Sequence, residues 1–180
     1  TGGPEKMVWA DLSLPSPSSG EVTIKHTYVG LNYIDTYHRS GLYPLPLPTG
    51  IGMEASGTIV DIGENVANFK LGERVSYVMA LGSYSTHRNI ATEKIVKLPE
   101  NIKDDEAAAI MLKGMTVEYL LERLFKVNKN HTVLFHAIAG GVGLIACQWL
   151  KYLGARVIGT VGSSEKEALA RKYGCDEVIL

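Results

Sequence analysis

The chain has 180 residues, of which 18 are basic and 19 are acidic, and its formal net charge is −1. This near-neutral balance provides no chain-wide attraction for nucleic acid or for an anionic membrane surface, so neither class of partner is expected. The 46% share of hydrophobic residues suits one large or two small domains, and no apolar run is long enough to span a bilayer.

The first part of the chain predicts a compact, mainly β domain. Four β-rich segments, separated by Gly, Pro and Asn turns, cover residues 22–29, 55–62, 74–78 and 94–98. From Asp104 the pattern becomes helical, through residues 106–112 and again through 117–125. We therefore expect a helical hinge between this domain and a second one.

A glycine turn joins an apolar strand to a helix in the second part. The strand begins at Val133, the glycines lie within 140–143, and the helix extends to Gly154. A second apolar strand, 156–161, completes a βαβ unit of about 30 residues. Glycines let the backbone approach phosphate oxygens, and a helix N-terminus offers N–H groups and a partial positive charge. The pattern predicts a dinucleotide site; the alternative is that the glycines only tighten the turn.

The sequence after this unit is short. A helix led by Ser164 and stopped by Gly174 is followed by a strand at 177–180. Three parallel strands are half of a dinucleotide fold. Because the chain also starts at Thr1 without a methionine, we expect a fragment of a longer protein, truncated at its C-terminus.

Six pieces of the sequence match one family in the family's order. They are residues 30–37 (GLNYIDTY), 39–43 (RSGLY), 52–57 (GMEASG), 72–75 (GERV), 112–116 (LKGMT) and the glycine loop running to Lys151. The chain thereby resembles the quinone oxidoreductase (zeta-crystallin-like) branch of the medium-chain dehydrogenase/reductase superfamily. The resemblance implies an α/β fold, in which a GroES-like, β-rich N-terminal domain is followed by the first half of a Rossmann doubly wound parallel sheet.

Domain boundaries and several site residues follow from this resemblance. Residues 1–115 are expected to form the substrate (catalytic) domain with its hinge helix, and residues 116–180 a partial Rossmann domain that binds NADPH. Asn32, Tyr37 and Tyr43 are expected to line the substrate pocket, unless the tyrosines only pack a wall of the β domain. Lys113 and Thr116 are expected to face the cofactor; the alternative is a solvated lysine and a packed threonine.

The resemblance is to members without zinc. Met53 and Asn32 stand where zinc-dependent members of the superfamily place a histidine and a cysteine, and the four-cysteine zinc lobe is missing. A thioether and an amide do not replace imidazole and thiolate as zinc ligands. The five histidines show no ligand spacing, and we expect no metal site.

The glycine loop follows the A-x-x-G-x-x-G form of the family, with Ala137, Gly140 and Gly143 at the named positions. Ile138 replaces a glycine of the general G-x-G-x-x-G pattern, and we expect its side chain to point into the sheet. The residues expected to contact the pyrophosphate are Ala139, Gly140, Gly141, Val142 and Gly143.

The choice of cofactor is argued from charge. NAD-binding Rossmann domains carry an acidic residue about 20 residues after the glycine loop, at the end of the second strand, where it binds the ribose hydroxyls. Here that position reads VGSSEK, and Gly162, Ser163 and Lys166 are the expected contacts of a 2′-phosphate, which predicts NADPH. A second interpretation of the same residues is a capping box between Ser164 and Glu167.

The expected reaction is metal-free, direct hydride transfer from NADPH to a quinone or another small electrophilic carbonyl compound. One alternative is an NADPH-dependent enone or enoyl reductase of the same superfamily. Another is an inactive fragment that only binds nucleotide, since the 180-residue chain alone lacks half of the Rossmann sheet. The resemblance implies a homodimer at full length, and the two cysteines, outside any disulfide or metal pattern, favour the cytoplasm.

Overall fold

The computed structural model of the protein describes all 180 residues. They divide into two compact units, Thr1–Leu112 and Lys113–Leu180. The first unit contains an antiparallel sheet and the second a parallel one. None of the helices combines the length and the apolar composition that crossing a bilayer requires.

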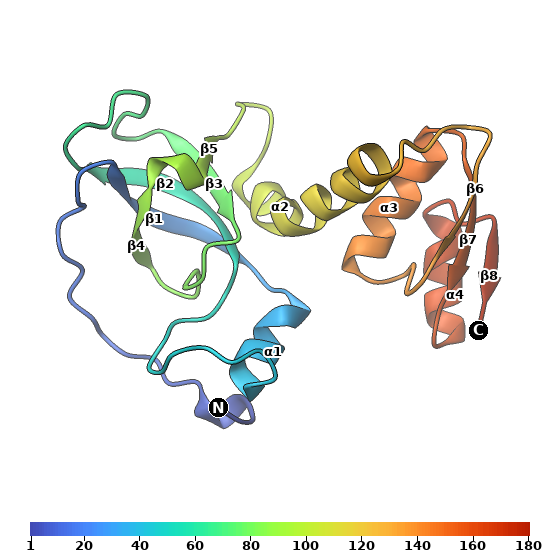
Figure 1. Cartoon of the computed structure of the whole chain (residues 1–180), viewed down its shortest axis with the longest axis horizontal. Helices are drawn as coiled ribbons and strands as arrows, with labels where there is room; N and C mark the ends of the chain where they lie inside the picture. The colour runs from blue at the N-terminus through green and yellow to red at the C-terminus, as the bar shows by residue number, and fades with distance from the viewer. The chain divides into compact units, whose positions relative to one another are not determined.

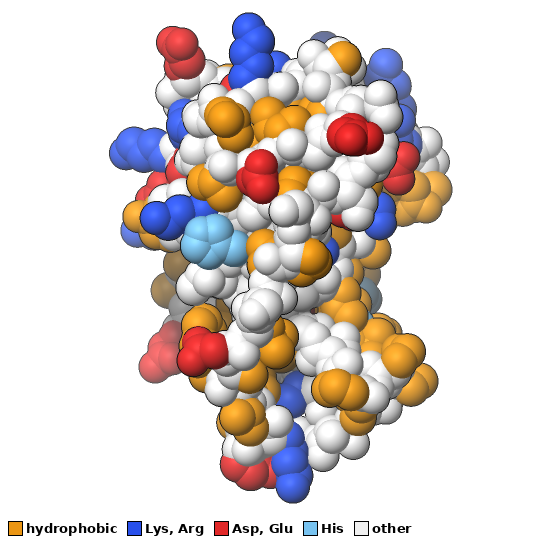
Figure 2. Space-filling view, turned by 90° about the vertical axis from the view of Figure 1, so that its left-hand side faces the viewer, with side chains coloured by type: hydrophobic (Ala, Val, Ile, Leu, Met, Phe, Trp, Pro, Cys, Tyr) orange, Lys and Arg blue, Asp and Glu red, His pale blue; other side chains and the backbone are white.

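A five-stranded antiparallel sheet with strand order β4-β1-β2-β3-β5 forms the first unit (Figure 1). The strands are β1 (Glu21–Gly30), β2 (Glu54–Ile62), β3 (Arg74–Val78), β4 (His87–Ala91) and β5 (Ile95–Lys97). Buried side chains from these strands, including Ile24, Ile59 and Tyr77, make its core. On the face shown in Figure 2, hydrophobic side chains are scattered among charged ones. The four predicted β segments are present as β1, β2, β3 and β5, whereas β4 was not predicted.

Helix α1 (Tyr33–Ser40) was also absent from the predicted elements, although its residues belong to a family motif. Asn32 precedes it as the N-cap residue, and the carboxylate of Asp35 accepts the backbone N–H of Asn32 at 2.9 Å. Gly41 ends the helix at φ 85°, a left-handed conformation that favours glycine.

The buried carboxylate of Glu54 links three segments of the first unit. It accepts a hydrogen bond from Asn32 Nδ2 at 2.7 Å and from the backbone N–H of Leu112 at 2.6 Å. Leu112 belongs to α2 (Asp104–Glu118), so β2 is tied to the start of α1 and to α2. Gly30 makes the approach possible, because a Cβ there would overlap Glu54 and the carbonyl of Ala108.

The remaining elements of the chain are short turns and the α/β unit. The 3₁₀ turns are Pro4–Lys6 and Thr92–Lys94, and α2 continues directly into a π-helical turn, Tyr119–Leu124. The two predicted helical stretches at 106–112 and 117–125 are therefore one continuous run. The second unit has β6 (Thr132–Phe135), α3 (Gly141–Tyr152), β7 (Arg156–Thr160), α4 (Ser164–Lys172) and β8 (Glu177–Ile179).

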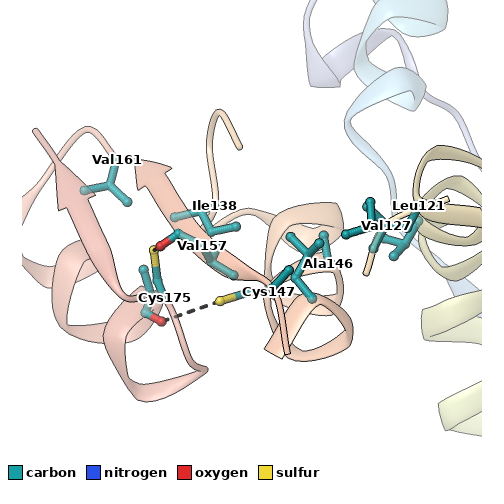
Figure 3. Close-up of a cluster of buried hydrophobic side chains, with 12 residues drawn as sticks. Leu121, Val127, Ile138, Ala146, Cys147, Val157, Val161 and Cys175 are labelled. Carbon is teal, nitrogen blue, oxygen red and sulfur yellow. Dashed lines mark hydrogen bonds between the residues drawn. The ribbon is translucent and has the colours of Figure 1, made fainter. Parts of the chain in front are cut away.

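The strands of the second unit are parallel and follow the order β6-β7-β8, with α3 and α4 packed beside them (Figure 1). This is the predicted half of a doubly wound sheet. Figure 3 shows Ile138, Val157 and Cys175 grouped in its core, with Cys147 of α3 close by. Cys147 donates its thiol hydrogen to the carbonyl of Ala170 at 3.9 Å, and burial raises the pKa of Cys147 to about 11.

Ile138 points into this core, as expected from the sequence. Its side chain is fully buried, and its backbone N–H donates to the carbonyl of Thr160 at 3.1 Å. Gly159 on β7 provides the space: a Cβ at that position would lie 2.7 Å from Ile138 Cβ and 2.9 Å from Cys175 Sγ. A branched side chain at 138 thus requires glycine at 159.

The capping box expected between Ser164 and Glu167 is wrong. The N-cap residue of α4 is Ser163, whose side chain accepts the backbone N–H of Lys166 at 3.3 Å. Ser163 is extended, with φ −163° and ψ 158°, whereas Ser164 is already the first helical residue. The helix begins one residue earlier than the Ser-x-x-Glu pattern indicated, because either of two adjacent serines can cap a helix and only the backbone geometry decides.

A partly buried polar network surrounds His26 in the first unit. The Nδ1–H of His26 donates to the carbonyl of Ser85 at 2.7 Å, and its Nε2 lies 3.0 Å from the hydroxyl of Tyr77, which therefore donates to it. Arg88 donates to the Tyr77 hydroxyl at 3.3 Å. Burial lowers the pKa of His26, and Arg88 adds to this effect, while the hydrogen bond to Ser85 opposes it.

We expect Gly159→Ala to destabilise the second unit by about 1–3 kcal/mol, because the new methyl group overpacks the site between Ile138 and Cys175. The matched control is Gly162→Ala, since a Cβ at 162 meets nothing within 4 Å. Urea unfolding of the two variants measures the difference. Equal midpoints for both variants would show that the packing of Ile138 does not constrain position 159.

We expect the stability of the first unit to fall as the pH drops below about 6.5, the ordinary pKa of histidine. The folded state keeps His26 neutral while the unfolded chain takes up a proton, so the loss grows as the pH falls towards the lowered pKa, by at most about 1.4 kcal/mol per pH unit. Urea unfolding at pH 7.5 and 5.5 measures it. The change in the free energy of unfolding between these pH values should shrink in His26→Gln. It should persist in His87→Gln, which replaces an exposed histidine of β4. An identical change in both variants contradicts the assignment.

Candidate functional site

The turn between β6 and α3 is closely packed. Ala137 adopts φ 51°, a left-handed conformation, and its carbonyl accepts the N–H of Gly140 at 2.8 Å. Gly143, in the first turn of α3, lies against this carbonyl: a Cβ there would be 2.5 Å from Ala137 O and would also overlap Ile138 O. Only glycine fits at 143 while the loop has this conformation.

The N-terminus of α3 presents backbone donors at this loop. Gly140 is the N-cap residue and has no side chain to cap the helix, and the first intrahelical bond runs from Leu144 N to Gly140 O at 2.8 Å. The N–H groups of Gly141, Val142 and Gly143 precede that bond, so they need acceptors outside the helix. Together with the positive end of the helix dipole, this arrangement fits a diphosphate.

Ala139 and Lys113, two further predicted cofactor contacts, also lie at this helix start. Ala139 is half-buried and packs against the core of the second unit, so it offers its backbone to the loop. The side chain of Lys113 crosses the same point, because a Cβ on Gly141 would lie 3.0 Å from Lys113 Cδ and Cε. Lys113 therefore brings a cation to the glycine loop. Thr116 follows about one turn later on α2 and is half-buried.

The residues expected at a 2′-phosphate follow β7. Gly162 is exposed, Ser163 caps α4, and Lys166 is exposed in the first turn of that helix. The first acidic side chains after the strand are Glu165 and Glu167, and Glu167 pairs with Arg171 at 2.9 Å. No carboxylate stands at the strand end, where a ribose 2′-hydroxyl would be recognised.

The residues expected in a substrate pocket come from α1 and its flanks in the first unit. Asn32 is 6% exposed, and its amide donates to Glu54, so its side chain is held within the unit. Tyr37 is half-buried, and its ring centroid lies 5.2 Å from that of Tyr43, which is 48% exposed. The two tyrosines thus form one aromatic surface, whereas Asn32 is buried at the N-cap of α1.

Sequence reasoning missed residues around this surface. Tyr33 is 74% exposed, and its ring meets that of Tyr37 edge to face at 5.3 Å, one helical turn apart. Recognising 33–40 as a helix would have found it, because residues i and i+4 share a helix face. On the other side of α1, Tyr84 donates its hydroxyl to the buried carboxylate of Asp35 at 2.9 Å. Burial and then Asp35 raise the pKa of Tyr84.

Buried residues that pack or form hydrogen bonds within the first unit occupy the two positions that carry zinc ligands in other members of the superfamily. Met53 is buried at the start of β2, and the amide of Asn32 is bound to Glu54. No three side chains of His, Cys, Asp or Glu lie together in an arrangement that could hold a metal ion.

Comparisons with known proteins match both units. Residues 18–121 match the family model of the alcohol dehydrogenase GroES-like domain, and residues 141–180 match that of the zinc-binding dehydrogenases. The chain is 49% identical over 180 residues to a quinone oxidoreductase of Pseudomonas aeruginosa, covering 99% of this chain and 55% of the relative. It is 43% identical to a 2-haloacrylate reductase of a Burkholderia species, covering 99% of this chain and 56% of the relative.

Among solved structures, the Escherichia coli quinone oxidoreductase complexed with NADPH superposes with a TM-score of 0.96 at 47% identity. The match covers 99% of this chain and 56% of that one. The chain thus spans about half the length of the relatives it matches. Because the GroES-like model covers more than half of the chain, the chain belongs to the alcohol dehydrogenase GroES-like family of the medium-chain dehydrogenase/reductase superfamily.

Proposed function

We propose that the protein is an NADPH-dependent quinone oxidoreductase. The observation that carries the proposal is the start of α3, where backbone donors, the close packing of Gly143 and the side chain of Lys113 meet. Donors and a cation at one point suit the two negative charges of a pyrophosphate. The relatives named quinone oxidoreductase, one of them solved with NADPH, support the same assignment.

In this proposal the second unit holds NADPH, which when bound supplies a hydride from C4 of its nicotinamide ring. The backbone from Ala139 to Gly143 binds the pyrophosphate, and Lys113 neutralises part of its charge. Gly162, Ser163 and Lys166 bind the 2′-phosphate of the adenosine, and Thr116 faces the nicotinamide side. We assign residues 116–180 to this nucleotide-binding domain and residues 1–115 to the substrate domain.

The first unit then contributes the quinone contacts. The rings of Tyr37 and Tyr43, tilted by 55° to each other, offer an aromatic surface to a flat substrate, and their hydroxyls donate to a quinone oxygen. Asn32 acts by positioning, because the hydrogen bond that its side-chain amide donates to Glu54 fixes the start of the helix that carries Tyr37. Transfer of one hydride leaves the quinone one proton short of the hydroquinone, and solvent supplies that proton, so the protein mainly orients the reactants.

A second candidate is an NADPH-dependent reductase of an activated carbon–carbon double bond, an enone or an enoyl thioester. The 43% identity to a 2-haloacrylate reductase favours it. Both candidates use the same nucleotide site and differ in the acceptor. A homodimer and a location in the cytoplasm belong to the proposal as well, and light scattering of the purified protein tests the first of them.

The nucleotide preference rests on Lys166. We expect Lys166→Ala to weaken NADPH binding by about 1.5–3 kcal/mol, or roughly ten- to hundredfold, because it removes a charge-assisted hydrogen bond to the 2′-phosphate. NADH binding should be unchanged, since NADH lacks that phosphate. Calorimetric titration of both nucleotides measures the effect, and Lys172→Ala, at the other end of α4, is the control. Unchanged NADPH affinity in Lys166→Ala would sink the 2′-phosphate assignment.

The acceptor is tested by turnover. We expect NADPH oxidation to be faster with 1,4-benzoquinone than with an enone such as cyclohexenone, and faster than NADH oxidation with the same quinone. Tyr37→Phe should lower kcat/KM for the quinone by about tenfold at most, the worth of one hydrogen bond, and leave NADPH affinity unchanged. A preference for the enone would select the second candidate, and nucleotide binding without turnover of either acceptor would assign the chain a binding role alone.

A further inference from the structure

We propose that Thr160 is a positioning residue of the nucleotide site, whose hydroxyl fixes the first residues of the glycine loop. The inference rests on the proposed function, because it concerns how the loop is prepared for a pyrophosphate. Thr160 is the last residue of β7, and it lies outside the six sequence pieces that match the family.

One residue of β7 contacts three successive residues of the loop. The hydroxyl oxygen of Thr160 accepts the backbone N–H of Ala137 at 3.2 Å and lies 3.1 Å from Nδ1 of His136. The carbonyl of Thr160 accepts the N–H of Ile138 at 3.1 Å. The parallel pairing of Phe135 with Gly159 sets this arrangement, since it places Thr160 beside the point where the chain leaves β6.

These contacts act on the strained point of the loop. Ala137 has φ 51°, which residues with a Cβ rarely adopt, so the conformation needs support from its surroundings. Its carbonyl accepts the N–H of Gly140 and lies directly against Gly143. A rotation of Ala137 would therefore displace the N-cap of α3 and the backbone donors that follow it.

The chemistry of a hydroxyl suits the position. Thr160 Oγ1 accepts from Ala137 and can donate its own hydrogen to a neutral imidazole at His136, so both neighbours are satisfied by one side chain. Valine has the same shape and keeps the β-branched preference for a strand, but it offers neither function. Serine keeps the hydroxyl and loses only the methyl group.

The test compares NADPH with adenosine 2′-monophosphate, which lacks the pyrophosphate and the nicotinamide riboside attached to it. We expect Thr160→Val to weaken NADPH binding by about tenfold, the effect of one lost hydrogen bond, and to leave binding of adenosine 2′-monophosphate within about twofold. Thr160→Ser should restore NADPH affinity to within about threefold. Thr132→Val is the matched control, because Thr132 is exposed at the far end of β6 and makes no side-chain hydrogen bond.

A second readout does not depend on any ligand. The exchange rate of the Ala137 amide hydrogen, followed by nuclear magnetic resonance in the full chain, should rise in Thr160→Val and not in Thr132→Val, with exchange in the core of β7 unchanged. Equal NADPH affinity in Thr160→Val and wild type would overturn the inference. So would an equal loss for both ligands accompanied by faster exchange throughout β7, which is the signature of a general structural role.

The two proposals fail in different ways. Wild-type protein that bound neither NADPH nor adenosine 2′-monophosphate would contradict the proposed function, and the cofactor role of Thr160 with it. Wild-type protein that bound both, combined with a Thr160→Val variant of the same affinity, would contradict the role of Thr160 alone.

Discussion

The contact of Gly143 with the carbonyls of Ala137 and Ile138 is the constraint on which the second unit depends. It brings the first turn of α3 against the end of β6, so that the helix dipole and the backbone donors point at one place. The same contact needs Ile138 to be anchored, and Ile138 is anchored because Gly159 leaves room for it on β7. Two glycines thus stabilise the same loop conformation. Gly143 allows the close approach of α3 to the loop, and Gly159 leaves space for the side chain of Ile138.

The first unit depends in a comparable way on one buried carboxylate. Burying Glu54 costs free energy unless its oxygens are hydrogen-bonded, and it satisfies them with Asn32 Nδ2 and Leu112 N. The hydrogen bond to Glu54 consequently holds Asn32, the N-cap residue of α1, in place. Tyr37 belongs to that helix, and Tyr43 follows shortly after it. The position of the aromatic surface therefore depends on the buried carboxylate of Glu54.

The parts of the structure that sequence predicted are those in which local chemistry decides. The strand, glycine turn and helix around 133–154 were predicted because apolar periodicity and glycine leave few other conformations. Helix α1 was missed because it has only 8 residues, most of them polar, and because its start is fixed by a contact with Glu54 that is distant in sequence. Strand β4 was missed because its sequence, HRNIA, does not alternate between apolar and polar residues. The contact between Thr160 and Ala137 joins β7 to the glycine loop, and the spacing of residues along the chain does not predict it.

The N-cap residue of α4, Ser163 instead of the predicted Ser164, affects how a 2′-phosphate can bind beside this helix. Ser163 caps the helix with its side chain, so a phosphate bound there meets a hydroxyl that already accepts from Lys166 N and has only its hydrogen to give. The first turn also contains Glu165 and Glu167, which stabilise the helix N-terminus but repel a 2′-phosphate. Arg171 offsets the charge of Glu167 through their ion pair. The side chains of Lys166 and Glu165 then remain as the opposing charges, and the proposed preference for NADPH rests on the side-chain charge of Lys166 together with the dipole of α4 rather than on the serine.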